Sequence, residues 1–257
     1  MRYRVLRPPY LYRWAVLLSV LVVAVAAMVS AFSSAEGTPT AVPAPAAAPV
    51  TATTTPPEPA DLVRGTAHAG KFVALTFDDG PDPVYTPQIL DALTRAGAVA
   101  TFCMVGTNVT RYPELVRTVL ARGMRLCDHT VSHDEQLSKR SEQRITAEIS
   151  GAWSDLQVAA GADVPVPYFR APGGAWSALM RDVAARQGMK SLSWSVDSRD
   201  WTQPGAAQIV ATVQRTIQPG AVVLLHDGGG KRTQTVEALN QLLPWLSAQG
   251  YRFDFPA

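Results

Sequence analysis

From Lys71 onward, short apolar runs alternate with longer stretches whose apolar residues recur at helical spacing. The short runs predict seven strands, at 71–77, 99–105, 124–127, 168–170, 190–196, 221–226 and 251–255. The stretches between them predict helices, at 86–97, 113–123, 141–161, 177–188, 205–217 and 233–250. Strands that alternate with helices favour a parallel sheet with helices outside. We therefore expect an α/β fold, a distorted (β/α)7 TIM-like barrel, and an open doubly wound sheet is the alternative.

The first 66 residues do not show this alternation. Residues 14–32 form an uncharged apolar run, which four arginines precede and small residues at 33–35 follow. This pattern is typical of an export signal, so residues 1–35 are predicted to be either a cleaved signal peptide or a retained membrane anchor. Residues 36–66 are predicted to be a disordered linker rich in Pro, Ala and Thr. Residues 67–257 would then form a single domain outside the membrane, either secreted or anchored.

The net charge of the chain comes from its N-terminal part. The whole chain has 23 Lys and Arg against 21 Asp and Glu, but residues 1–60 contain four of the basic and only two of the acidic residues. The rest of the chain therefore has no net charge. A nucleic-acid-binding domain needs a basic surface, so we expect no nucleic-acid partner, and membrane contact only through the N-terminal segment.

Polar residues gather directly after five of the predicted strands. The clusters lie at 78–81 (DDGP), 128–133 (DHTVSH), 170–174 (RAPGG), 197–201 (DSRDW) and 226–227 (HD). In a parallel barrel, the C-terminal ends of all strands open on one face, where active sites are built. The five clusters are therefore predicted to form one site, although they lie far apart in the sequence.

Two histidines in these clusters have the spacing of metal ligands. His129 and His133 are four residues apart and would share one face of a helical turn. A strand-end carboxylate such as Asp79 would complete a set of two histidines and one carboxylate. The alternative is a chance histidine pair near the surface, but the paired aspartates at another strand end favour a metal. Asp78 would then be free to act as a general base.

Two further residues fit this acid–base chemistry. Arg170 lies among apolar neighbours and could pair with the carboxylate of the base; the alternative is a surface salt bridge. His226 follows a strongly apolar run, and a nearby carboxylate would favour its protonated form, which suits a general acid. The alternative for His226 is a structural histidine that only makes hydrogen bonds.

The chain resembles a known family in five motifs that occur in the family's order: TFDDGP (76–81), HTVSH (129–133), RAPGG (170–174), DSRDW (197–201) and LLHD (224–227). These motifs are similar to those of the polysaccharide deacetylases of carbohydrate esterase family 4, which share the NodB-homology domain. The resemblance covers about residues 71–255. It implies a distorted barrel of βα units and a divalent metal ion, usually Zn²⁺, with Co²⁺ or Ni²⁺ as alternatives.

The resemblance also implies a role for each of ten residues. The metal ligands would be Asp79, His129 and His133. The catalytic residues would be Asp78 as the base, Arg170 as its partner, His226 as the acid and Asp200 as the carboxylate that tunes the acid. The substrate-binding residues would be Trp201 and Leu224, which line the groove for the acetyl methyl, and Gly173, whose backbone N–H completes an oxyanion hole.

These roles predict a metal-dependent hydrolase that removes N-acetyl groups from an amino-sugar polymer, such as peptidoglycan or a chitin-like glycan, and releases acetate. One alternative is an O-acetyl esterase that acts on xylan or another glycan, and another is a non-catalytic glycan-binding module. We expect a monomer whose partner is the acetylated glycan. The chain departs from the family at Ala171 and Gly173, where relatives often have Pro and Tyr, so we expect a wider cleft near the acetyl group.

The two cysteines of the chain, Cys103 and Cys127, lie in consecutive predicted strands. Consecutive strands in this topology are often neighbours, so in an exported protein the two residues could form a disulfide. The alternative is two buried thiols that pack as small apolar residues. The sequence leaves both open.

Overall fold

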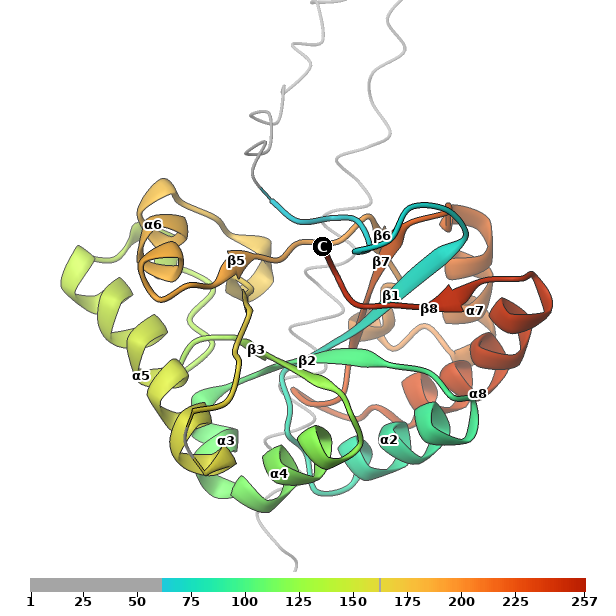
Figure 1. The fold of residues 1–257 in the computed structure, drawn as a ribbon, viewed down its shortest axis with the longest axis horizontal. Helices are drawn as coiled ribbons and strands as arrows, with labels where there is room; N and C mark the ends of the chain where they lie inside the picture. The colour runs from blue at the N-terminus through green and yellow to red at the C-terminus, as the bar shows by residue number, and fades with distance from the viewer. Residues whose placement is uncertain (1–61, 162) are drawn as a thin grey trace, which may run out of the picture. The chain divides into compact units, whose positions relative to one another are not determined.

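The computed structural model of the protein describes residues 62–161 and 163–257 (Figure 1). All seven predicted strands lie within these ranges. The predicted signal or anchor over residues 1–35, and the predicted linker as far as residue 61, lie outside them. In the described part of the chain, no helix combines the length and the apolar character that are needed to cross a membrane.

The described residues form a parallel sheet. Its strands are β1 Phe72–Asp78, β2 Ala100–Met104, β3 Arg125–Asp128, β4 Tyr168–Phe169, β5 Lys190–Ser191, β6 Val196–Asp197, β7 Ala221–His226 and β8 Arg252–Phe253. The strands pair in the order β5-β4-β3-β2-β1-β7-β6, and β8 pairs with the start of β1. Every one of these pairs is parallel, so the C-terminal strand ends lie at the same edge, as the alternating pattern predicts.

The connections between the strands are mostly helical (Figure 1). The helices are α2 Tyr85–Arg95, α3 Gly106–Arg111, α4 Pro113–Ala121, α5 Glu142–Ala160, α6 Ala178–Arg186, α7 Ala206–Thr216 and α8 Thr233–Ala248. Three short 3-10 helices follow strand ends or precede helices: η1 Leu137–Lys139, η2 Pro172–Gly174 and η3 Asp200–Thr202. Each predicted helix is present. The additional helix α3 is too short to show an amphipathic period in the sequence.

The two faces of the sheet have different neighbours. In β1, Val73, Leu75 and Phe77 belong to the large apolar core that includes the helices. A second, smaller cluster contains only strand and loop residues: Ala74, Cys103, Cys127, Tyr168, Leu192 and Val222. Helices therefore cover one face, and the other face packs on itself inside the curved sheet. This arrangement confirms the predicted distorted barrel, because a doubly wound sheet would have helices on both faces.

The predicted strand at 190–196 is wrong in one respect, because it is two short strands and not one. β5 pairs with β4, whereas β6 pairs with β7 at the other end of the strand order. Leu192 between them forms an isolated bridge with Val63. The segment therefore changes partners as it passes from one end of the sheet to the other. The apolar pattern runs through it without a break, so the sequence does not reveal the change.

Residues 62–66, which the sequence assigns to the end of the linker, pair with this part of the sheet. The N–H of Val63 donates to the carbonyl of Ser191 at 2.8 Å, and the N–H of Ser193 donates to the carbonyl of Val63 at 2.8 Å. Gly65 and Thr66 form further bridges to the domain. We call residues 62–66 the N-terminal strap. The domain boundary at residue 67 stays a prediction; the strap lies before it in the sequence but pairs with the domain.

Cys103 and Cys127 are paired residues of the neighbouring strands β2 and β3, and both are fully buried in the inner cluster. They form a disulfide. Of the two alternatives that the sequence leaves open, the structure has the bridge.

Candidate active site

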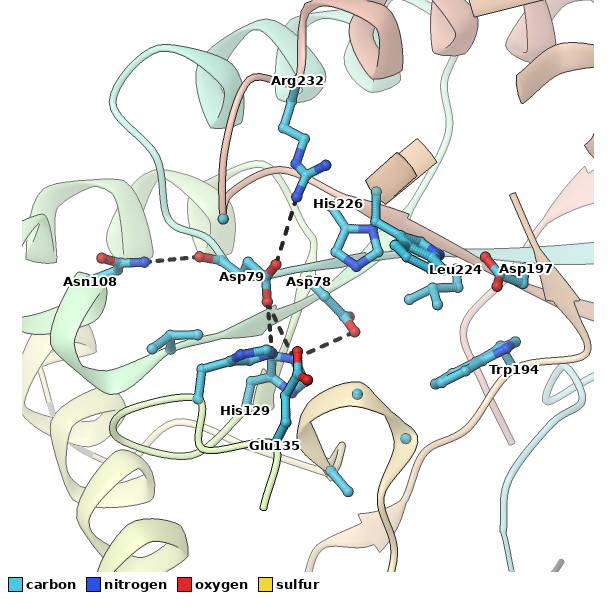
Figure 2. A pocket seen from close by; sticks show the side chains of 17 residues that line it. Asp78, Asp79, Asn108, His129, Glu135, Trp194, Asp197, Leu224, His226 and Arg232 are labelled. Carbon is cyan, nitrogen blue, oxygen red and sulfur yellow. Dashed lines mark hydrogen bonds and ion pairs between the residues drawn. The ribbon is translucent and has the colours of Figure 1, made fainter. Parts of the chain in front are cut away.

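A cavity of about 620 Å³ opens at the C-terminal strand ends (Figure 2). Eight of the ten predicted site residues line it: Asp78, Asp79, His129, His133, Gly173, Trp201, Leu224 and His226. The other two, Arg170 and Asp200, are buried, and each forms a hydrogen bond with one of the lining residues. The structure thus brings all five sequence clusters to one place.

Three side chains in the cavity can hold a metal ion. Asp79, His129 and His133 offer ligand atoms that all lie within 4.8 Å of one another. Asp79 Oδ1 lies 3.5 Å from His129 Nε2 and 3.2 Å from His133 Nε2. This oxygen is buried and accepts no hydrogen bond from any described residue. A buried carboxylate oxygen without a donor is costly, so a cation bound there fits the residues present.

The ring of His129 is fixed by the backbone of Arg170. His129 Nδ1 lies 2.8 Å from the carbonyl oxygen of Arg170. A carbonyl can only accept, so Nδ1 donates this hydrogen bond and carries the proton. In the neutral ring, the lone pair is then on Nε2, which faces Asp79. A ring held in this way is prepared to bind a metal.

The loop that carries the two histidines is held from behind by α5. Thr130 and His133 have φ values of 66° and 56°, in the left-handed region that side chains rarely adopt. Buried Glu148 accepts hydrogen bonds from the N–H and the hydroxyl of Ser132, each at 2.8 Å, and its carbonyl accepts from the N–H of Val131 at 3.1 Å. These contacts stabilise a loop conformation that is unfavourable by itself.

Asp78 lies at the end of β1, on the inner face of the sheet. Its Oδ1 accepts a hydrogen bond from Arg170 Nη1 at 2.5 Å, and its Oδ2 lies 3.6 Å from His129 Nε2. Arg170 is fully buried, and its guanidinium also donates to Thr76 Oγ1 at 3.0 Å and to the carbonyl oxygens of Leu192 and Ser193 at 3.2 and 3.0 Å. One carboxylate oxygen of Asp78 is therefore fixed, and the other lies beside His129, one of the three potential ligands.

His226 lies at the end of β7, next to β1. Its Nδ1 lies 2.7 Å from Asp200 Oδ1, and its backbone N–H donates to Asp200 Oδ2 at 2.9 Å. Thr235 of α8 also donates to Asp200 Oδ2, at 2.8 Å. Asp200 is therefore held by three hydrogen bonds and binds the side of the imidazole that lies away from the cavity, so Nε2 remains available to a substrate.

The carboxylates and the burial of the cavity shift the pKa values of its side chains. Burial opposes protonation of His226, but the hydrogen bond and charge of Asp200 outweigh burial and raise its pKa. Burial and the neighbouring His129 lower the pKa of His133. Burial tends to raise the pKa of Asp79, yet the surrounding histidines outweigh it and hold this pKa well below its ordinary value. His226 thus stays protonated to a higher pH than an ordinary histidine does, and Asp79 stays ionised.

Six residues that line the cavity were not singled out in the sequence: Val105, Asn108, Glu135, Trp194, Gly229 and Arg232. The run of glycines at 228–230 after His226-Asp227 is a signal for a close backbone approach, and it points to Gly229. Nothing in the sequence pattern assigns Arg232 or Asn108 to the cavity. Ala171 and Gly173, where the chain departs from the family, both line the cavity; Ala171 contributes only a methyl group and Gly173 has no side chain.

The site combines three groups that hydrolysis of an acyl compound requires. It has a set of ligand atoms for a cation, a carboxylate next to them, and a histidine at the end of the neighbouring strand that is paired with a buried carboxylate. Such a set can activate a water molecule and protonate a leaving group. The fold and the site are therefore those of a hydrolase.

The comparisons with known proteins agree with this class. A sequence profile described as polysaccharide deacetylase matches residues 65–192. A peptidoglycan-N-acetylglucosamine deacetylase of Bacillus cereus is 42% identical over 186 residues, which cover 71% of this chain and 85% of that protein. A chitooligosaccharide deacetylase of Bradyrhizobium sp. is 38% identical over 198 residues, which cover 73% of this chain and 90% of that protein.

A solved structure is also similar. The crystal structure of a peptidoglycan N-acetylglucosamine deacetylase in complex with 4-naphthalen-1-yl-N-hydroxybenzamide superimposes with a TM-score of 0.71 at 33% identity, and the match covers 76% of this chain and 90% of that one. The chain therefore belongs to the polysaccharide deacetylase family, as its five motifs indicate, and is a hydrolase.

Proposed function

We propose that the protein removes N-acetyl groups from an amino-sugar polymer, such as peptidoglycan or a chitin-like glycan, and releases acetate. The observation that carries this proposal is that the possible ligands, the base and the acid surround one open cavity (Figure 2). The relatives named above support the substrate class, since one is named for peptidoglycan and the other for chitooligosaccharides.

A divalent ion, most simply Zn²⁺, would be held by Asp79, His129 and His133. Two imidazoles and one carboxylate are a common ligand set of catalytic zinc, and they leave positions for water and substrate. A bound Zn²⁺ would polarise the acetyl carbonyl and acidify a water molecule. Co²⁺ and Ni²⁺ accept the same ligands, so the residues do not select one metal.

Asp78 acts as the general base in this proposal. Arg170 holds its Oδ1, so Oδ2 is free to take a proton from the attacking water on the side of the ligand residues. The tetrahedral oxyanion that forms after the attack needs hydrogen-bond donors. The N–H of Gly173, in the cavity wall, supplies one of them.

His226 acts as the general acid. The hydrogen bond and charge of Asp200 outweigh burial and raise its pKa, which favours the protonated form, and Asp200 orients it with Nε2 toward the substrate. The departing amine of the sugar must take up a proton because an amide anion is a very poor leaving group. The acetyl methyl lies against Leu224 and Trp201, both of which line the cavity. Trp201 is half exposed, so its indole can also contact the sugar.

The proposed place of action is outside the cytoplasm. The apolar run at 14–32 would either direct secretion or anchor the chain, and the extended linker would let the domain reach a cell-wall polymer. We propose a monomer whose partner is the glycan, with membrane contact only through the N-terminal segment.

Acetate release by the purified, Zn²⁺-loaded protein from peptidoglycan, chitin oligomers and acetylated xylan tests the function. We expect release from at least one of the two N-acetylated polymers. Asp78→Asn should keep Zn²⁺ and lose turnover, whereas Asp79→Ala should lose both. Release from acetylated xylan alone would show an O-acetyl esterase instead, and full turnover of Asp78→Asn would refute the assignment of the base.

A further inference from the structure

Arg232 lies in the wall of the cavity and has no role in the chemistry described above. It belongs to the loop between β7 and α8 and is only 4% exposed. Its Nε donates to the carbonyl oxygen of Gly228 at 2.6 Å, and its Nη2 lies 3.9 Å from Asp79 Oδ2. Its Nη1 is buried and has no hydrogen-bond partner among the described residues. A buried guanidinium is costly, so its position beside Asp79 calls for an explanation.

The two carboxylate oxygens of Asp79 have different surroundings. Oδ1 faces the two histidines, whereas Oδ2 faces Arg232 on the other side (Figure 2). Gly229 closes the same side, because a Cβ atom at this position would collide with Oδ2. The loop after β7 therefore packs against Oδ2 through both Arg232 and Gly229, while Oδ1 faces the histidines.

The backbone of Asp79 is held as well. Its φ of 73° lies in the left-handed region, which residues other than glycine adopt only at a cost in free energy. Asn108 Nδ2 donates to its carbonyl oxygen at 2.9 Å (Figure 2). Gly228 packs so closely on this carbonyl that a Cβ atom there would collide with it. Contacts from helix α3 and from the loop after β7 thus fix the main chain and the side chain of one residue.

We propose that Arg232, together with Gly228 and Gly229, forms a clamp that positions Asp79 so that its Oδ1 faces the histidine pair. This inference rests on the proposed metal site. Arg232 is a positioning residue in it, since it acts through Asp79 and not on the substrate. A carboxylate that is free to rotate would lose conformational entropy when the metal ion binds. The clamp avoids this loss because it holds the carboxylate in the binding orientation beforehand.

The test compares substitutions of the basic residues at two neighbouring positions of the chain. Arg232→Lys keeps the positive charge but loses the planar fork and the bond from Nε to Gly228, so its effect reports on geometry rather than charge. Lys231→Arg is the matched control, because Lys231 is the next residue and is exposed. Gly229→Ala is a second variant, because its added Cβ atom would collide directly with Oδ2.

Zn²⁺ affinity is measured by competition with a chromophoric chelator, and Co²⁺ absorption reports the surroundings of the bound ion. Loss of an outer partner of a metal ligand typically costs about 10- to 100-fold in affinity, so we expect a loss of this size in Arg232→Lys and Gly229→Ala, with an altered Co²⁺ spectrum. Lys231→Arg should match the wild type. The melting temperature of each metal-free variant confirms that it is folded.

Wild-type affinity and an unchanged Co²⁺ spectrum in both Arg232→Lys and Gly229→Ala would overturn the clamp while leaving the metal site intact. The metal site itself would be refuted by a different outcome, in which the wild-type protein binds Zn²⁺ no more tightly than the Asp79→Ala variant does. The two failures are therefore distinguishable.

Discussion

Removing the charge of Arg170 should destabilise the protein far more than the loss of an ordinary arginine. The guanidinium is fully buried, and it pairs with Asp78, of which only 4% is exposed. In Arg170→Met, the Asp78 carboxylate would stay in a dry site without its cation. The carbonyl oxygens that Arg170 now satisfies would lose their donors too.

The magnitude follows from the burial of both partners. Breaking a buried ion pair from one side typically costs about 3–5 kcal/mol. A domain is stable by about 5–15 kcal/mol, so in a domain near the middle of this range, at about 10 kcal/mol, Arg170→Met should lose about 30–50% of the free energy of unfolding and still fold. Asp78→Asn leaves the guanidinium unpaired and should lose a similar amount. The double variant contains neither charge, so we expect it to lose at least about 2 kcal/mol less than the sum of the single losses.

Urea unfolding, followed by tryptophan fluorescence at one pH and without metal, measures all four free energies of unfolding. Lys231→Met is a suitable control, since this exposed side chain has no buried partner in the described part of the chain and its replacement should change the free energy by about 0.5 kcal/mol or less. If the losses of the two single variants added up in the double variant to within about 0.5 kcal/mol, the reasoning from a buried pair would be refuted.

Three further predictions concern other parts of the molecule. The Asp200 carboxylate favours the protonated form of His226, so Asp200→Asn should lower the pKa of His226. The alkaline limb of the pH profile of kcat/KM should then move to lower pH. An unmoved limb would contradict the role of His226 as the acid. The double variant Cys103→Ser, Cys127→Ser opens a bridge across 24 residues and should lower the free energy of unfolding by about 3 kcal/mol, and two reactive thiols in the unfolded, unreduced wild type would disprove the bridge. A chain without residues 1–66 lacks the N-terminal strap and should unfold in less urea and turn over more slowly than the full chain, whereas equal values would show that the strap is dispensable.

The sequence by itself determined the order and type of most elements. The apolar runs and the helical periods predict the parallel α/β barrel, because each strand and helix must bury one face and the spacing of its apolar residues follows from that need. The same sequence placed the polar clusters after strands whose C-terminal ends share one edge. The position of the cavity could therefore be predicted, and the five motifs were sufficient to indicate the family.

The tertiary structure decided which groups face one another. No pattern in the sequence shows that the 190–196 segment divides between β4 and β7, that the strap pairs with residues 191 and 193, or that Arg232 lies beside Asp79. These contacts join residues that are far apart along the chain, and they form only because the rest of the barrel has brought the backbones together. A local pattern reports which face of an element is buried, whereas its partner on that face is set by packing over long distances.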